Sequence, residues 1–312
     1  MKRLSVRIPG RNNFSVAVLG PGAIGGFLSA LFFQKNIPVT CIAKEETAEI
    51  ISQNGIRLES SAFGDFIAHP EVVTYLDKAP DILFITTKAT TLSDALKRVD
   101  PGFLTDAVII PFLNGIEHME LLRSVYGKRV VAATIGNVEV KKVSADHIIH
   151  STPSAVIELA SGGDIPDNLL KRIASLFSDV GIPVKLIKGE AEVLWRKLAR
   201  LNAIACTTSA ANKPLGFIRR DGSWRLHLEN CVRETAAVAR AERVDINPGA
   251  VMAQIDSLPE GLGSSMQRDV NAGKPSEIDA IAGAVIRSGK KHGLECPTIE
   301  KLIILIKSRG KS

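Results

Sequence analysis

A glycine-rich turn between an apolar strand and a helix is the sequence feature that most constrains the fold. Gly20-Pro21-Gly22-Ala23-Ile24-Gly25 follows the β-branched run 16–19 and precedes a helical pattern. A G-x-G-x-x-G sequence in this context is typical of a βαβ unit that binds a dinucleotide. Gly20 permits the tight turn, Gly22 lets the backbone approach a pyrophosphate, and Gly25 lets helix and strand pack closely. The alternative is a glycine turn without a ligand.

Apolar β-branched runs alternate with longer amphipathic segments through the first half of the chain. The runs that we expect to form strands are residues 16–19, 39–43, 82–86, 108–112 and 130–134. Such nearly continuous apolar runs suit strands covered on both faces by helices, and they predict a mostly parallel sheet. Further short segments predict a mixed edge to that sheet. They are residues 147–150, 155–160 and 184–187.

The second half of the chain is predicted to be helical. Strand patterns nearly vanish after Gly189, and an Ala-rich helical pattern replaces them. The expected helices are residues 190–211, 224–244, 248–257, 277–292 and 297–308. The predicted architecture is therefore α/β: a Rossmann-like dinucleotide-binding domain over 1–188, then an all-α substrate and catalytic domain over 189–312.

The residue that closes the second strand discriminates NAD from NADP. An acid there bonds the ribose 2′-hydroxyl, whereas a basic residue accommodates a 2′-phosphate. Lys44 stands at this place, 24 residues after Gly20, and favours NADP. Glu45 and Glu46 come next, so a slip of one residue would reverse the choice. Lys88 follows the strand 82–86, where it could either touch the nucleotide or begin a helix.

Three further segments carry a family resemblance. They are Asn114-Gly115, the run Glu192-Val193-Leu194-Trp195-Arg196-Lys197-Leu198, and Ser264-Ser265-Met266 followed by Glu277-Ile278-Asp279. Together with the glycine turn and Lys88, the chain resembles the ketopantoate reductase (2-dehydropantoate 2-reductase) family over essentially residues 14–308.

The resemblance implies NADPH-dependent reduction of the ketone of a 2-keto acid. It implies that Lys197 is the catalytic ammonium and Glu277 its carboxylate partner, with Asn114 and Ser265 as substrate ligands. It also implies which residues hold NADP(H). These are Gly20, Gly22, Ala23, Ile24, Gly25, Lys44, Lys88, Asn114 and Glu277.

The chemistry asks for these residue types independently. Hydride arriving at a carbonyl carbon develops an alkoxide, so the site needs a cation or a proton donor aimed at that oxygen. Lys197 can be both, and a neighbouring carboxylate would favour its charged form. The structural alternatives are a solvated lysine on an amphipathic helix, a helix N-terminal acid for Glu277, and a turn residue for Asn114.

The substrate pocket departs from the family pattern. In that pattern Asn side chains follow the catalytic lysine at +4, +8 and +18, where this chain has Leu201, Ala205 and Leu215. Asn202 lies one residue beyond the first position, about 100° round the helix, and is kept as a substrate-binding candidate. A pocket that loses polar ligands should recognise the 4-hydroxyl end of ketopantoate less well.

The leading function is reduction of 2-dehydropantoate to pantoate, a step of pantothenate biosynthesis, or of a less polar 2-keto acid. One alternative is a related two-domain dehydrogenase that works with NAD. Another is an NADP-binding sensor that has lost catalysis, which the missing Asn residues favour and the retained Lys197, Ser265 and Glu277 disfavour.

Charge and cysteine content limit the partners. The formal charge is +6, but residues 1–13 and 301–312 carry +4 each, so residues 14–300 carry −2 and indicate no nucleic-acid partner. The four cysteines lack metal-ligand spacing, and the histidines show none either, so we expect no metal and a reducing cytoplasmic setting. No apolar run predicts a secretory signal or a membrane span. A small-molecule partner and a monomer or homodimer are expected.

Overall fold

The structure is a computed structural model that describes residues 14–160 and 165–309, and it divides into two compact units. Unit 1 comprises Met1–Leu113 and His118–Val193, and unit 2 comprises Asn114–Glu117 and Leu194–Ser312. The division therefore falls a few residues after the expected boundary at 188, inside the helix α6 (Glu190–Ala211). The short segment Asn114–Glu117, which the sequence assigned to the first domain, belongs to unit 2.

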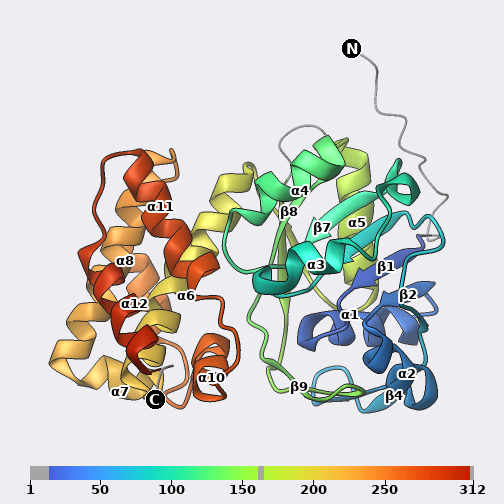
Figure 1. Cartoon of the computed structure of the whole chain (residues 1–312), viewed down its shortest axis with the longest axis horizontal. Coiled ribbons are helices and arrows are strands. Elements are labelled where there is room, and N and C mark those ends of the chain that lie inside the picture. The colour runs from blue at the N-terminus through green and yellow to red at the C-terminus, as the bar shows by residue number, and fades with distance from the viewer. Residues whose placement is uncertain (1–13, 161–164, 310–312) are drawn as a thin grey trace. The chain divides into compact units, whose positions relative to one another are not determined.

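The centre of unit 1 is a five-stranded parallel sheet that contains four of the five predicted apolar runs, all but residues 130–134 (Figure 1). Its strands, in spatial order, are β5 (Glu71–Val73), β2 (Val39–Ile42), β1 (Val16–Leu19), β6 (Ile82–Ile85) and β7 (Val108–Pro111). Every residue of β1, β6 and β7 is buried. The chain order reverses between β1 and β6, and ligands of doubly wound sheets bind at the carboxyl ends of the strands at such a point.

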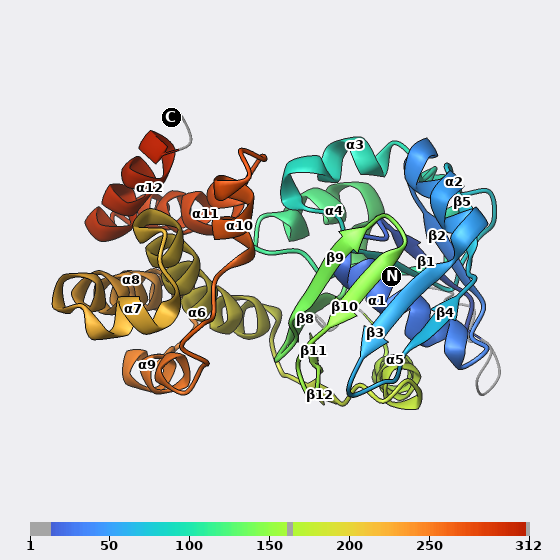
Figure 2. The same ribbon diagram turned by 90° about the horizontal axis from the view of Figure 1, so that it is seen from below.

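Two smaller sheets replace the expected mixed edge. β8 (Ala132–Gly136), β11 (Val156–Ala160) and β12 (Val184–Leu186) form a mixed three-stranded sheet, and one bridge from Ile109 to Val130 links β7 to the segment before β8. β10 (His147–His150) instead joins a four-stranded sheet with β3 (Ile56–Ser60), β4 (Phe66–Ala68) and β9 (Val140–Ser144), seen in Figure 2. The sequence missed β3, β4, β5 and β9 because they are short and partly exposed rather than continuously apolar.

The helix after the glycine turn is the most buried helix of unit 1. α1 (Ala23–Gln34) contacts β1 and β2 of the parallel sheet and also all four strands of the four-stranded sheet. Residues 25–32 are all buried, which suits a helix that is apolar on every side. The ring of Phe32 lies 5.5 Å from Phe84 on β6 and 5.8 Å from Phe177 on α5 (Asp167–Asp179).

The remaining helices of unit 1 lie in the connections between strands. They are α2 (Glu45–Asn54), η1 (Ala89–Thr91), α3 (Leu92–Leu96), η2 (Pro101–Leu104), α4 (His118–Tyr126) and η3 (Gly127–Arg129).

Unit 2 is helical, as predicted, and is built round α8 (Gly222–Ala241). α8 packs against α7 (Leu215–Arg220), α9 (Pro248–Asp256), α11 (Ala284–Lys291) and α12 (Pro297–Arg309). The sequence missed α7 and α10 (Ser265–Asn271) because each spans two turns or fewer. The predicted helix 277–292 is a π-helical turn, η4 (Asp279–Gly283), followed by α11.

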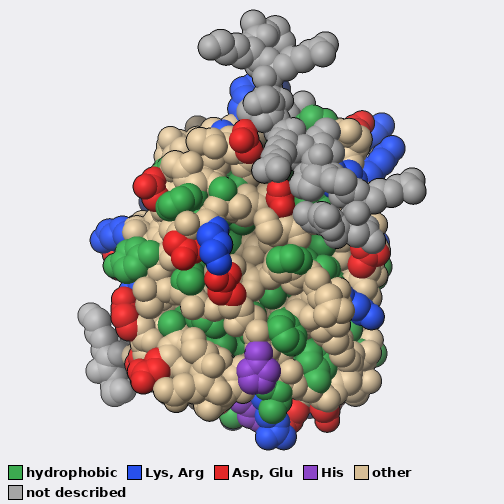
Figure 3. All heavy atoms as spheres, turned by 90° about the vertical axis from the view of Figure 1, so that its right-hand side faces the viewer, with side chains coloured by type: hydrophobic (Ala, Val, Ile, Leu, Met, Phe, Trp, Pro, Cys, Tyr) green, Lys and Arg blue, Asp and Glu red, His purple; other side chains and the backbone are tan. Residues whose placement is uncertain are grey.

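The basic chain ends have different structural positions. Residues 1–13 lie outside the described part of the chain. At the other end Lys301, Lys307 and Arg309 lie on α12, where Arg309 Nη2 donates to Asn271 Oδ1 at 3.1 Å. On the face of unit 1 in Figure 3, basic and acidic side chains are interspersed. Among residues 14–160 and 165–309, no helix is long and apolar enough to cross a membrane.

Replacing Phe32 by Ala should strongly destabilise unit 1. The side chain is fully buried between two aromatic rings, and removing it leaves a cavity that costs about 3–5 kcal/mol of unfolding free energy. Urea denaturation followed by circular dichroism measures this loss. Phe33→Ala is the matched control, because Phe33 is 37% exposed and should cost far less. Equal losses for the two variants would contradict the assignment of Phe32 to the core.

Candidate active site

The glycine turn closes on itself at the carboxyl end of β1. Gly20 has φ +85°, and the Gly22 N–H donates to the Gly20 carbonyl at 2.6 Å. A Cβ on Gly25 would lie 2.4 Å from the Gly20 oxygen, whereas one on Gly22 would meet only that oxygen, at 3.9 Å. Gly25 is therefore required by packing, while Gly22 leaves its surface open to an approaching group. The first turn of α1 carries no acid, so this turn fits an anionic pyrophosphate.

Two threonines that sequence reasoning missed support the turn. Thr86 follows β6, and its hydroxyl donates to the Gly20 carbonyl at 2.8 Å. The methyl group of Thr87 occupies the space where a Cβ on Gly20 would lie, 2.5 Å away. The sequence signal for both is their place at the carboxyl end of the strand that neighbours β1.

An arginine that sequence reasoning also missed separates the roles of Lys44 and Glu45. Lys44 is exposed and directly precedes α2. Glu45 is held by Arg98, whose Nη1 and Nη2 donate to its two carboxylate oxygens at 3.0 and 3.1 Å. The same guanidinium donates to the carbonyls of Ala43 and Thr74, at the carboxyl ends of β2 and β5. Arg98 thus neutralises Glu45 and lowers the pKa of its carboxyl, so Glu45 does not cancel the charge of the neighbouring Lys44.

Two lysines lie at other places round the turn. Lys88, the predicted nucleotide ligand, is exposed and precedes η1 after β6. Lys142 on β9 was not predicted, and its ammonium donates to the carbonyl of Pro21 inside the glycine turn at 3.4 Å. Burial lowers the pKa of Lys142. A partly desolvated cation beside an anion-binding turn favours a phosphate nearby.

Unit 2 brings together three of the residues that the sequence singled out. Lys197 lies on α6, Glu277 precedes η4, and Asn114 comes from the short segment that joins this unit. The Asn114 amide donates to Glu277 Oε2 at 2.9 Å, and the Glu277 residue is only 6% exposed.

The environment of Lys197 lowers the cost of losing its proton. Burial lowers the pKa of its ammonium from 10.5 to about 8, Glu277 opposes this shift, and Arg200 adds to it. A lysine with this pKa is still charged at neutral pH, yet it can donate its proton readily. Lys197 is therefore an amine that can give up its proton, and Glu277 is a carboxylate that favours its charged form.

A hydrogen bond between Ser264 and Thr208 of α6 fixes the position of the adjacent Ser265. Thr208 lies about 20° round the helix from Lys197 and so on the same face. Its hydroxyl is 3.0 Å from that of Ser264, which also accepts from the Gln267 N–H and caps α10. Ser265, the first residue of α10, is exposed next to this contact.

Asn202 does not lie on the Lys197 face. It is about 140° round α6 from Lys197, fully buried, and its amide donates to Thr235 Oγ1 on α8 at 3.0 Å. The Cys206 thiol donates to its oxygen at 3.2 Å. This correction to the predicted substrate ligands has a simple cause: the amide satisfies its polar groups inside the helical core.

The three positions where the family pattern has Asn side chains are apolar and packed. Ala205 and Leu215 are fully buried in the core of unit 2. Leu201 lies one turn along α6 from Lys197 and stays partly exposed. The surface next to the lysine is therefore apolar where the pattern is polar.

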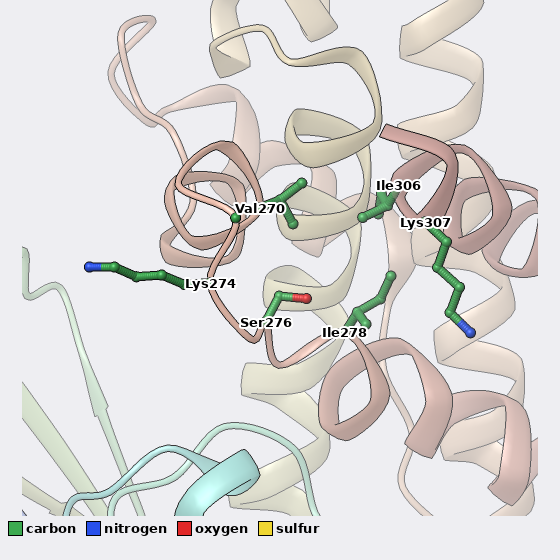
Figure 4. Close-up of a pocket in the computed structure, with 7 residues that line it drawn as sticks. Val270, Lys274, Ser276, Ile278, Ile306 and Lys307 are labelled. Carbon is green, nitrogen blue, oxygen red and sulfur yellow. The ribbon is translucent and has the colours of Figure 1, made fainter. Parts of the chain in front are cut away.

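A separate cavity of about 150 Å³ in unit 2 contains none of the predicted site residues. It is lined by Val270, Gly273, Lys274, Ser276, Ile278, Ile306 and Lys307. Figure 4 shows the ammonium groups of Lys274 and Lys307 extending away from its centre, whereas the Ser276 hydroxyl lies among the apolar side chains of Val270, Ile278 and Ile306. In the described part of the chain, no cluster of His, Cys, Asp or Glu is suited to a metal ion.

Comparison with known proteins decides the family. The chain matches the family "Ketopantoate reductase PanE/ApbA" over residues 16–162, and "Ketopantoate reductase PanE/ApbA C terminal" over residues 191–310. The chain belongs to the ketopantoate reductase family. Membership places it among oxidoreductases of that type and confirms the resemblance that the motifs carried.

Individual relatives are distant but cover nearly the whole chain. The uncharacterized oxidoreductase YkpB of Bacillus subtilis is 27% identical over 91% of this chain and 94% of its own length. The 2-dehydropantoate 2-reductase of Caulobacter vibrioides is 26% identical over 94% of this chain and 98% of its own length.

Solved structures of the family share this fold. A ketopantoate reductase of Ralstonia eutropha superimposes with a TM-score of 0.85 at 24% identity, covering 95% of this chain and 98% of its own. D-mandelate dehydrogenase, solved with NADH and anilino(oxo)acetate, superimposes with a TM-score of 0.87 at 20% identity and the same coverage.

The Lys197 amine should titrate near pH 8. Competitive acetylation at a series of pH values, followed by mass spectrometry of the Lys197 peptide, measures this directly and without substrate. Glu277→Gln should lower the midpoint further, because the carboxylate favours the charged amine. A midpoint near the reference lysine value of about 10.4, unchanged by Glu277→Gln, would contradict the described environment.

Proposed function

We propose that the protein uses NADPH to reduce the ketone of a small 2-keto acid to a hydroxyl, with 2-dehydropantoate as the first candidate substrate. The observation that carries the proposal is the arrangement of Lys197, Glu277 and Asn114 in a chain of the ketopantoate reductase family. D-mandelate dehydrogenase, a structural neighbour, is solved with NADH, which supports a nicotinamide cofactor here.

The cofactor, when bound, supplies the hydride, and the chain supplies charge and a proton. Unit 1 would hold the pyrophosphate against the turn formed by Gly20 and Gly22 and on the N–H groups of the first turn of α1 (Ala23, Ile24), since the N–H groups of both glycines bind backbone carbonyls. Lys197 would point its ammonium at the substrate carbonyl oxygen, stabilise the negative charge that develops there and donate a proton from Nζ.

The other residues of the site would set the state of that ammonium and hold the substrate. Glu277 keeps Lys197 charged before the reaction, and Asn114 fixes the Glu277 carboxylate by its hydrogen bond. Ser265, exposed at the start of α10, is the proposed polar ligand of the substrate.

The preference for NADPH rests on the edge formed by β2 and β5. Glu45 is paired with Arg98, which compensates the negative charge that would repel a 2′-phosphate at this edge. Lys44 beside it is exposed and can reach a 2′-phosphate, with Lys88 and Lys142 as further cations near the nucleotide.

The substrate pocket favours a 2-keto acid less polar than 2-dehydropantoate as a second candidate. Leu201 stands where the family pattern has an Asn, and Ala205 and Leu215 are buried. A role in pantothenate biosynthesis therefore depends on which acid is turned over. A cytoplasmic setting is part of the proposal because the four cysteines are free and buried, and a monomer or homodimer stays a prediction.

A panel of 2-keto acids tests the reaction. We expect NADPH oxidation with 2-dehydropantoate or with a branched apolar acid such as 2-ketoisovalerate. Lys197→Ala should lower kcat/KM by about 10²–10⁴, the usual contribution of a general acid, whereas Lys290→Ala on the exposed surface of α11 should leave it unchanged. Tight NADPH binding without turnover of any acid would favour the sensor instead, and unchanged activity of Lys197→Ala would exclude the mechanism.

Three variants at the β2 edge test the cofactor choice. Lys44→Ala should weaken NADPH binding about tenfold and leave NADH binding unchanged, because only NADPH carries the 2′-phosphate. Arg98→Gln should shift the preference toward NADH by releasing Glu45, and Glu45→Gln is its control. Nucleotide fluorescence titration measures each dissociation constant without substrate. An unchanged ratio of the two constants in both Lys44→Ala and Arg98→Gln would contradict the assignment.

A further inference from the structure

Unit 2 holds a segment of only four residues, Asn114–Glu117, that comes from between β7 and α4 of unit 1. Three contacts bind it to the start of η4 and to α11. Asn114 donates to Glu277, Gly115 approaches the Ala280 carbonyl so closely that a Cβ there would lie 2.2 Å from the oxygen, and Glu117 pairs with Arg287. The segment thus brings the Asn114 amide to Glu277, a residue of the proposed site.

Arg287 binds two carboxylates at once. Its Nε and Nη2 donate to the two oxygens of Glu117 at 2.8 and 2.7 Å, which is the planar two-point geometry that only arginine offers. Its Nη1 and Nη2 donate to the oxygens of Asp279 at 2.7 and 3.1 Å, and Nη2 also donates to the Asp279 carbonyl at 3.0 Å. These bonds raise the pKa of the guanidinium above its ordinary value. One side chain thus joins the segment to the first turn of η4.

The π-helical turn makes room for this contact. A Cβ on Gly283 would lie 2.6 Å from Asp279 Oδ1 and 3.0 Å from Arg287 Nη1. Gly283 ends η4, and the turn begins two residues after Glu277. Single π-helical turns inside helices occur frequently at functional sites. The turn itself carries Asp279, which binds Arg287, and the residue two positions before it, Glu277, accepts from Asn114.

We propose that Arg287 and Glu117 form a clamp that holds Asn114 against Glu277, so that Arg287 is a positioning residue of the active site. The expected effect of the clamp on turnover rests on the proposed function. It acts through two bonds: Glu117–Arg287 fixes the end of the segment, and this keeps the Asn114 amide on Glu277 Oε2. The carboxylate is then held beside Lys197, whose charge it favours against burial and against Arg200.

Exposure distinguishes this role from ordinary stabilisation. The side chains of Arg287, Glu117 and Asp279 are 42%, 46% and 80% exposed. Exposed ion pairs contribute at most about 1 kcal/mol each to folding stability, and a bidentate arginine within a network lies at the upper end of that range. A clamp should therefore affect turnover and the titration of Lys197 more than it affects the melting temperature.

The test compares Glu117→Gln and Arg287→Lys with Glu260→Gln. The control breaks another exposed pair of unit 2, Arg220–Glu260 at 2.7 Å, which lies away from the segment. Both clamp variants should lower kcat about tenfold with a smaller change in KM, since misplaced groups cost mainly the chemical step. Arg287→Lys keeps the charge and loses the two-point geometry, so it should resemble Glu117→Gln. NADPH binding and the melting temperature should match those of the control.

Two further measurements make the proposal specific. Competitive acetylation should place the Lys197 midpoint about half a pH unit lower in Glu117→Gln than in the wild type, because its carboxylate partner is less well held. In a double-mutant cycle, Glu117→Gln should add almost nothing to the loss caused by Asn114→Ser, since Glu117 acts through Asn114.

The outcomes separate the clamp from the proposed function. Full additivity in the cycle, or a Lys197 midpoint in Glu117→Gln equal to that of Glu260→Gln, would overturn the clamp. Absence of turnover by the wild-type protein would overturn the proposed function alone, because the acetylation measurement needs no substrate. A shifted midpoint in that case would still support the clamp.

Discussion

The attraction between the Lys197 ammonium and the Glu277 carboxylate is the interaction on which the active site depends. Burial favours the neutral amine, and a neutral amine is a weaker proton donor and stabilises an alkoxide less than an ammonium does. Glu277 opposes this effect, Arg200 adds to it, and the pKa of about 8 is the net result. Because Glu277 is itself only 6% exposed, its carboxylate needs hydrogen-bond partners, and Asn114 provides one.

The two units divide the work by the kind of structure that each can build. A parallel sheet ends in backbone turns and a helix N-terminus, which bind phosphate through N–H groups and need few side chains. Lysines around the turn add positive charge, and Arg98 neutralises the nearby carboxylate of Glu45. A helical unit instead offers side chains on fixed faces, so Lys197, the proposed proton donor, and the polar contact from Thr208 to Ser264 lie on one side of α6.

Much of this could be predicted because the signals are local. The G-x-G-x-x-G turn, the buried runs of β1, β6 and β7 and the Ala-rich helices each depend on a few neighbouring residues. The strands β3, β4, β5 and β9 were missed since they are short and take their conformation from partners elsewhere in the chain. Asn202 was misplaced because its sequence position says nothing of Thr235, which binds it across the helical core.

The sequence by itself determined the class of chemistry: a dinucleotide turn, a lysine with a carboxylate partner, and the family that combines them. Only the tertiary structure decided which residues act together. It placed Asn114 in unit 2 against Glu277, gave Glu45 to Arg98, and assigned Glu117 and Arg287 to one contact across 170 residues of chain. The physical reason is that residue type and local pattern fix what a side chain can do, whereas its partner is fixed by packing between distant segments.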